Sequence, residues 1–192
     1  HLMHAALRNV LGTHVQQKGS LVNEEKLRFD FSHTKAVNSD EIKLIEDQVN
    51  EIIKKDIATE IFETSFDEAI KMGALAFFGD KYGEKVRVLK IGGDYSTELC
   101  GGTHVEKTGQ IGNFKIVSES SISSGVRRIE AVTSNEANLL LKEESNEIKK
   151  IADSFGVSIS DLARKVKESK KVSDLIQKKF KEFDNINNMN LE

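Results

Sequence analysis

The sequence lacks several features that define broad classes of protein. It holds a single cysteine, which excludes an internal disulfide framework and is typical of a reducing compartment. No apolar run approaches the roughly 18 to 20 residues that a membrane span needs, and no secretory signal is visible. We therefore expect a cytoplasmic protein with no membrane partner. The net charge of -3 argues against broad, non-specific adhesion to nucleic acid and leaves room for a local basic patch.

The size and composition indicate an ordered protein. With 192 residues, of which 38% are hydrophobic and 31% charged, the chain is long enough for one good core with an appendage, or for two small domains. These fractions are not those of a disordered chain. The first residue is a histidine inside a helix-like apolar pattern, from which we expect a fragment of a longer chain.

The hydrophobic pattern predicts an α+β fold, in which an antiparallel-sheet domain with flanking helices precedes a helical extension. Turn and cap signals divide the first part of the chain into short elements. We expect helices over residues 2–11, 39–53 and 66–72, and strands beginning at Leu21 and over 27–32, 57–64, 86–91, 113–118 and 126–133. A serine-rich connection over 120–125 is predicted to join the last two strands.

The texture of the sequence changes at about residue 134 to long helices without strands. One helix is expected to run to about Phe155 and to stop at Gly156, and a second to run from about Ser160 to about Phe183. We therefore predict two domains, over residues 1–134 and 135–192. The apolar residues of the second helix share one face: Leu162, Val166, Leu175, Ile176, Phe180 and Phe183.

The stretch from Ser96 to His104 contains the chemistry. A thiolate at Cys100 and an imidazole at His104 can turn onto one metal ion, since the glycines between them allow a tight bend. His1 and His4 share a helix face and are further candidate ligands. Alternatively, Cys100 is a small core hydrophobe and the histidines are merely packed. The two glycines favour the metal, because a core role would not call for them.

Three blocks of sequence together resemble the editing region of alanyl-tRNA synthetase. They are GALAFFGDKYGEKVRV over residues 73–88, STELCGGTHV over 96–105 and GVRRIEAV over 125–132. The opening HLMHAALRNVLGTHVQQKGSLV matches this family too. The resemblance covers about residues 1–133, within the second additional domain shared by threonyl- and alanyl-tRNA synthetases, and the tail resembles the start of the linker that follows.

The resemblance implies a zinc site. The family uses an H-x-x-x-H pair with the cysteine and histidine of the C-x-x-x-H loop. His1 matches the second histidine of that pair, whereas the first would lie four residues earlier, outside this sequence. Three of the four expected ligands are thus present, at His1, Cys100 and His104. His4 matches a position that is not normally a ligand. We expect weakened zinc binding, or a fourth position filled by water, His4 or a foreign group.

The resemblance also implies an activity, the hydrolysis of seryl- or glycyl-tRNA(Ala) within an enzyme that ligates alanine to the acceptor end of tRNA(Ala). Gln17 falls on the family's active-site glutamine and would hold substrate or water. The backbone of Gly101 and Gly102 would lie close to the terminal adenosine or the amino acid. From the residues alone, the favoured interpretation of Gln17 is an ordinary polar turn residue.

Arg127 and Arg128 are adjacent in a predicted strand and therefore face opposite sides of the sheet. One would meet tRNA phosphates while the other pairs with Glu130 or Glu119, or both are solvated. Two other functions remain open: a non-catalytic module that docks the tRNA acceptor end on a structural metal site, and a threonyl-type editing domain. In the latter, the cysteine loop typically has arginine and proline where this chain has glycine and threonine. The oligomeric state is left open.

Overall fold

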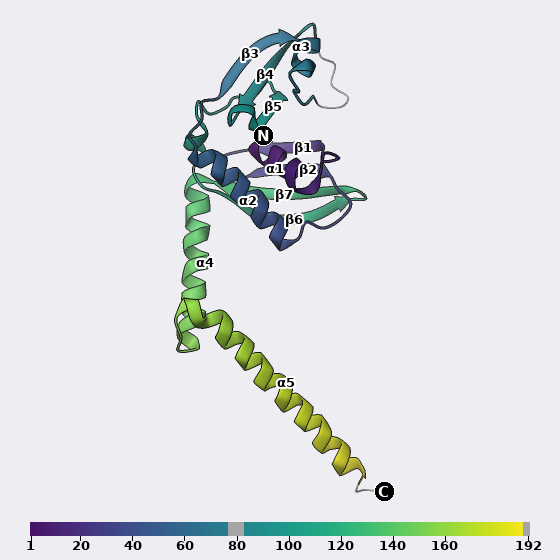
Figure 1. Cartoon of the computed structure of the whole chain (residues 1–192), viewed down its shortest axis with the longest axis vertical. Coiled ribbons are helices and arrows are strands. Elements are labelled where there is room, and N and C mark those ends of the chain that lie inside the picture. Colours follow the sequence, from purple (N-terminus) through teal and green to yellow (C-terminus); the bar gives the residue numbers. More distant parts are fainter. Residues whose placement is uncertain (77–82, 190–192) are drawn as a thin grey trace. The chain divides into compact units, whose positions relative to one another are not determined.

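The computed structural model describes residues 1–76 and 83–189, with side chains described up to residue 181 in the last helix. The chain forms two compact units, His1–Leu139 and Leu140–Glu192 (Figure 1). The elements follow in the order α1 (Leu2–Leu11), β1 (Gln17–Val22), β2 (Leu27–Ser32), α2 (Ser39–Lys54), β3 (Glu60–Ser65), α3 (Phe66–Lys71), β4 (Lys85–Ile91), η1 (Gly93–Tyr95), β5 (Ser96–Leu99), η2 (Thr108–Ile111), β6 (Phe114–Ser123), β7 (Val126–Thr133), α4 (Ser134–Ser154) and α5 (Ile159–Met189).

The first unit is built on a four-stranded antiparallel sheet in the order β1-β2-β7-β6. Helices α1 and α2 cover one face of it (Figure 1). The apolar faces of these helices and the inward residues of β2 and β7 form the main core, which includes Leu7, Phe31, Ile45 and Ile129. A capping box is present at the start of α2, where the Asn38 side chain accepts hydrogen bonds from the backbone N–H groups of Asp40 and Glu41.

A second sheet, in the order β3-β4-β5, extends the same unit. Successive side chains of a strand point to opposite faces, and in β4 both faces are buried. Val88 packs in a small core with α3, whereas Leu89 packs in the main core. The same alternation in β5 turns Leu99 into the small core and Glu98 toward α1. The two antiparallel sheets with flanking helices confirm the predicted α+β fold.

Some boundaries differ from the prediction. Residues 96–99, expected in a loop, form β5, and most of the serine-rich segment belongs to β6, which continues to Ser123. The turn is therefore a tight one over Ser124 and Gly125, and Gly125 adopts a positive φ of 72°. The serines pair with β7, and such backbone pairing does not require apolar side chains. Residues 77–82 of the first resemblance block lie outside the described residues.

The described residues of the second unit lie mainly in α5 and in the larger part of α4. Four residues of the predicted apolar face of α5 are exposed, Val166 by 44%, Leu175 by 57%, Ile176 by 49% and Phe180 by 65%, whereas Leu162 is only partly exposed. Phe183 lies outside the described side chains. Among the described residues, no helix is both long and apolar enough to cross a membrane.

Candidate metal centre

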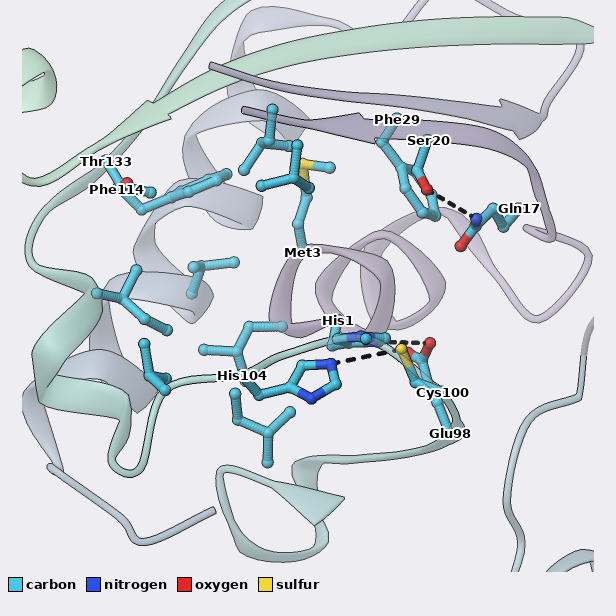
Figure 2. Close-up of a pocket in the computed structure, with 18 of the residues that line it drawn as sticks. His1, Met3, Gln17, Ser20, Phe29, Glu98, Cys100, His104, Phe114 and Thr133 are labelled. Atoms are coloured by element: carbon cyan, nitrogen blue, oxygen red, sulfur yellow. Dashed lines mark hydrogen bonds and ion pairs between the residues drawn. The ribbon is translucent and has the colours of Figure 1, made fainter. Parts of the chain in front are cut away.

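Three predicted ligands come together from distant parts of the chain. His1 stands at the N-terminal end of α1, while Cys100 and His104 lie in the loop after β5. The candidate ligand atoms of the three residues all lie within 4.8 Å of one another. Cys100 Sγ is 3.4 Å from His104 Nε2, and the His1 and His104 rings are 5.2 Å apart (Figure 2). No other group of this kind occurs in the described part of the chain.

The loop that carries Cys100 is fixed by Arg87 of β4. The Arg87 Nη1 donates to the carbonyl oxygens of Cys100 and Gly102, each at 2.7 Å. The Cys100 N–H donates in turn to the Arg87 carbonyl at 3.2 Å. These bonds hold the bend that turns the thiol toward His104.

Gly102 keeps the ligand atoms uncovered. A Cβ built at this position would lie 3.6 Å from Cys100 Sγ and 3.8 Å from His104 Nε2. These are ordinary van der Waals distances, so a methyl group fits. Any longer side chain would extend beside the candidate ligand atoms. At Gly101 a Cβ would meet nothing within 4 Å.

Glu98 is a buried carboxylate at the base of the site, with only 1% of its surface exposed. It accepts hydrogen bonds from His1 Nδ1 at 2.8 Å, from His4 Nδ1 at 3.1 Å and from Ser96 Oγ at 3.0 Å. Burial favours the protonated carboxyl, but the hydrogen bonds and charge of the two histidines outweigh it and lower the pKa of Glu98. The carboxylate is therefore ionised at neutral pH.

Sequence reasoning missed Glu98, although a signal was available. It stands two residues before Cys100 in an extended stretch, so the alternation of a strand places both on one side of the backbone. His4, a candidate fourth ligand, is not part of the group formed by His1, Cys100 and His104. Its Nδ1 bonds Glu98, and its Nε2 is buried without a hydrogen-bond partner.

The electrostatics of the two candidate ligand histidines, His1 and His104, differ. Burial opposes protonation of His1, but hydrogen bonding and negative charge at Glu98, with a smaller contribution from Cys100, raise its pKa. Burial, aided by the positive charges at His1 and Arg87, lowers the pKa of His104. His104 is therefore biased toward the neutral imidazole that binds metals.

The cluster opens onto a cavity of about 580 Å³ in the first unit. Its walls are largely apolar and include Leu2, Met3, Val22, Leu27, Phe29 and Phe114. Gln17 and Ser20 line it on the β1 side, and Gln17 Nε2 donates to Ser20 Oγ at 3.0 Å (Figure 2). A β-bulge between Gln17 and Gly19 inserts an extra residue into β1. The bulge brings the side chains of Gln17 and Ser20 to the same face of the strand.

Of the other predicted contact residues, only Gly102 lines this cavity. Gly101, Arg127 and Arg128 are not among the lining residues. Arg127 forms a bidentate ion pair with Glu119, in which two guanidinium nitrogens donate to the two carboxylate oxygens. Arg128 forms one with Asp30, at 2.7 and 2.8 Å.

The residues present fit a zinc ion. One thiolate and two imidazoles are donors that zinc prefers, and the 3.4 Å between sulfur and nitrogen is close to the roughly 3.5 Å expected for two ligands of one tetrahedral zinc. His104 Nε2 faces the thiol, whereas its Nδ1 is buried without a hydrogen-bond partner.

Comparison with known proteins agrees with the sequence resemblance. The sequence profile of the family described as "Threonyl and Alanyl tRNA synthetase second additional domain" matches residues 86–130. The alanine–tRNA ligase of Xanthomonas campestris pv. campestris (strain B100) is 54% identical over 167 residues, which are 87% of this chain and 19% of that protein. The alanine–tRNA ligase of Acetivibrio thermocellus is 56% identical over 166 residues, 86% of this chain and 19% of that protein. The chain belongs to the alanyl-tRNA synthetase family.

The match places the candidate metal centre within a segment of the synthetase sequence. The chain spans about a fifth of the length of the alanine–tRNA ligases it matches. The matching profile begins in β4 and ends in β7, so it includes Arg87, Glu98, Cys100 and His104. The His/Cys/His cluster and the cavity beside it are thus features of a synthetase segment.

Proposed function

We propose that this segment of an alanyl-tRNA synthetase is an editing site, which hydrolyses tRNA(Ala) mischarged with serine or glycine. One juxtaposition carries the proposal: the His1, Cys100 and His104 cluster and Gln17 line the same cavity. An enzyme that attaches alanine to tRNA needs such a site, because its synthetic pocket also admits similar amino acids. A pocket built for alanine cannot firmly exclude glycine, which is smaller, or serine, which adds only a hydroxyl group.

His1, Cys100 and His104 would hold the zinc ion. Because His1 Nδ1 is bonded to Glu98, its Nε2 remains for the metal. Bound there, zinc would supply a Lewis acid that polarises an ester carbonyl or a water. The single cysteine must stay reduced to bind it, which agrees with a cytoplasmic enzyme.

Gln17 would orient the reacting groups. Its Nε2 is engaged by Ser20, so its Oε1 is left to accept a hydrogen bond from a hydroxyl, an ammonium or a water in the cavity. An amide takes up no proton at neutral pH, so the role of Gln17 is to position and not to act as a base. The apolar walls formed by Phe29 and Phe114 would exclude bulk water from the ester.

The tRNA would enter with its acceptor end. The Gly102 backbone borders the cavity and can approach the terminal adenosine or the amino acid closely, because it has no side chain, and Gly101 next to it would contribute from the rim. Arg127 and Arg128 are proposed phosphate contacts outside the cavity. Each is paired with a carboxylate, so a phosphate would have to share or displace Glu119 or Asp30.

The test is deacylation of Ser-tRNA(Ala) by the chain, by the chain extended to include the family's upstream histidine, and by the intact synthetase. We expect release of serine, loss of this activity on chelation, and slower release after Gln17→Ala. Ala-tRNA(Ala) is the control substrate and should persist.

The same assay separates the alternative functions. Tight binding of Ser-tRNA(Ala) without turnover in all three proteins would contradict the proposal and support a docking module with a structural metal. Preference for Ser-tRNA(Thr) over Ser-tRNA(Ala) would support a threonyl-type domain.

A further inference from the structure

We infer that Glu98 is a positioning residue of the metal centre, which presets His1 for metal binding by fixing its tautomer and its ring orientation. The inference rests on the proposed metal site and is independent of whether that site hydrolyses an ester. Figure 2 shows the carboxylate beside His1, on the side away from His104.

The hydrogen bonds fix where the protons lie. An ionised carboxylate only accepts, so a histidine nitrogen that bonds it must be the donor. His1 Nδ1, at 2.8 Å from Glu98 Oε2, therefore carries a proton, and in the neutral ring the lone pair is on Nε2. A metal ligand held in this way needs no change of tautomer when the ion arrives.

His4 keeps the carboxylate in place. It lies almost one helical turn after His1, on the same face of α1, and donates from Nδ1 to the other carboxylate oxygen at 3.1 Å. Ser96 Oγ donates to that same oxygen at 3.0 Å. With Oε1 held by two donors, the carboxylate cannot rotate freely, and Oε2 remains directed at His1.

The cost of this arrangement favours a functional reason for it. Burying a carboxylate is expensive even when it is paired, and packed apolar residues usually stabilise a fold as well or better. Here the carboxylate also leaves His4 Nε2 buried without a hydrogen-bond partner. A purely structural link between α1 and β5 would not require a charge, or a charge aimed at a metal ligand.

The experiment compares the metal-free protein with Glu98→Gln, with Ser96→Ala as the matched control. Ser96→Ala removes one hydrogen bond to the same carboxylate and none to a histidine. The probes are Co²⁺ titration, followed by the thiolate-to-cobalt charge-transfer band, and ¹⁵N NMR of the histidine ring nitrogens. Thermal unfolding without metal shows whether each variant is folded.

We expect His1 to show a single Nδ1–H tautomer in the unsubstituted protein and in Ser96→Ala, and a mixture of tautomers in Glu98→Gln. The Co²⁺ affinity should fall about 10- to 100-fold in Glu98→Gln and should change much less in Ser96→Ala. Equal Co²⁺ affinity in Glu98→Gln and the unsubstituted protein would overturn the inference, as would an absence of Co²⁺ binding in the latter.

If Glu98→Gln does not fold, ¹⁵N NMR of the unsubstituted protein still tests the inference. An Nε2–H tautomer at His1 would overturn it without any variant. Failure of the proposed hydrolysis is distinguishable. A protein that shows the expected tautomer and affinities but releases no serine from Ser-tRNA(Ala) refutes the editing activity and leaves the role of Glu98 standing.

Discussion

The Arg87 guanidinium donates from one nitrogen, Nη1, to the carbonyl oxygens of both Cys100 and Gly102, each at 2.7 Å. A side chain of β4 thereby sets the curvature of a loop that the sequence marks only by its glycines. The two carbonyls belong to Cys100, a candidate metal ligand, and to Gly102, which has no side chain to cover the candidate ligand atoms.

We expect Arg87→Leu to loosen this loop while leaving the fold intact. Hydrogen bonds from a charged donor contribute about 1.5 to 3 kcal/mol, so unfolding by urea should show a loss of that order in the metal-free protein. Co²⁺ affinity should fall about tenfold, as for other changes to groups that support metal ligands. Arg164→Leu is the control, because its ion pairs are exposed and lie in α5. An unchanged Co²⁺ affinity in Arg87→Leu would show that the loop holds its shape without the guanidinium.

Gly102→Leu should block metal uptake without unfolding the protein. The added side chain begins 3.6 Å from Cys100 Sγ and extends beside His104, whereas the same change at Gly101 begins in open space. Neither glycine has a positive φ, so neither substitution strains the backbone. Co²⁺ titration should show at least about a tenfold loss for Gly102→Leu and little change for Gly101→Leu. Similar losses in both variants would mean that the glycines act through backbone flexibility.

The sequence indicates which residues belong to the candidate site, but not how they come together. Spacing and resemblance suffice to select His1, Cys100, His104 and Gln17, because those residues recur in the family's motifs. Their meeting place could not be derived from spacing, since it depends on how α1 packs against β5. The role of Glu98 depends on that packing too, although its side of the strand follows from alternation with Cys100.

The fold was predictable where local signals and packing agree. Asn38 and Glu41 have the residue types and the spacing of a capping box, which indicates a helix start. The structure contains this capping box at the start of α2. The serine-rich end of β6 was not predictable in this way, because its pairing with β7 is made by the backbone. The partners of Arg127 and Arg128 also follow from strand register, which a single sequence does not state.

The ion pair between Asp30 and Arg128 should make stability depend on pH. Hydrogen bonds from Arg128 outweigh burial and lower the pKa of Asp30. A carboxyl with a folded pKa below its unfolded value stabilises the fold above the unfolded value, about 3.9 for Asp. That contribution is lost as the pH falls through the folded pKa.

Asp30→Asn should therefore reduce the free energy of unfolding at pH 7 by about 1.5 to 3 kcal/mol, and the difference from the unsubstituted protein should shrink from about pH 5 downward. Urea unfolding at several pH values measures both effects. Asp47→Asn is the matched control, because the Asp47 carboxylate pairs with Lys43 on the exposed face of α2. A loss in Asp30→Asn that stays constant with pH would point to packing and not to charge.

The first compact unit ends inside α4. The sequence predicts a boundary at residue 134, whereas the compact units divide after Leu139, inside α4. Between these positions Ala137 is fully buried, and Asn138 Oδ1 accepts a hydrogen bond from Asn113 at 2.6 Å. These contacts belong to the first unit and hold the first turns of α4.

We expect a chain that ends at Leu139 to keep the unfolding free energy of the first unit and its Co²⁺ affinity. A chain that ends at Ser134 should lose about 1 to 2 kcal/mol, the sum of one buried methyl group and one hydrogen bond. Asn113→Ala in the chain ending at Leu139 tests the hydrogen bond alone and should give only part of that loss. Equal urea midpoints for the two shortened chains would place the boundary at residue 134, because the first turns of α4 would then contribute nothing to the stability of the sheet domain.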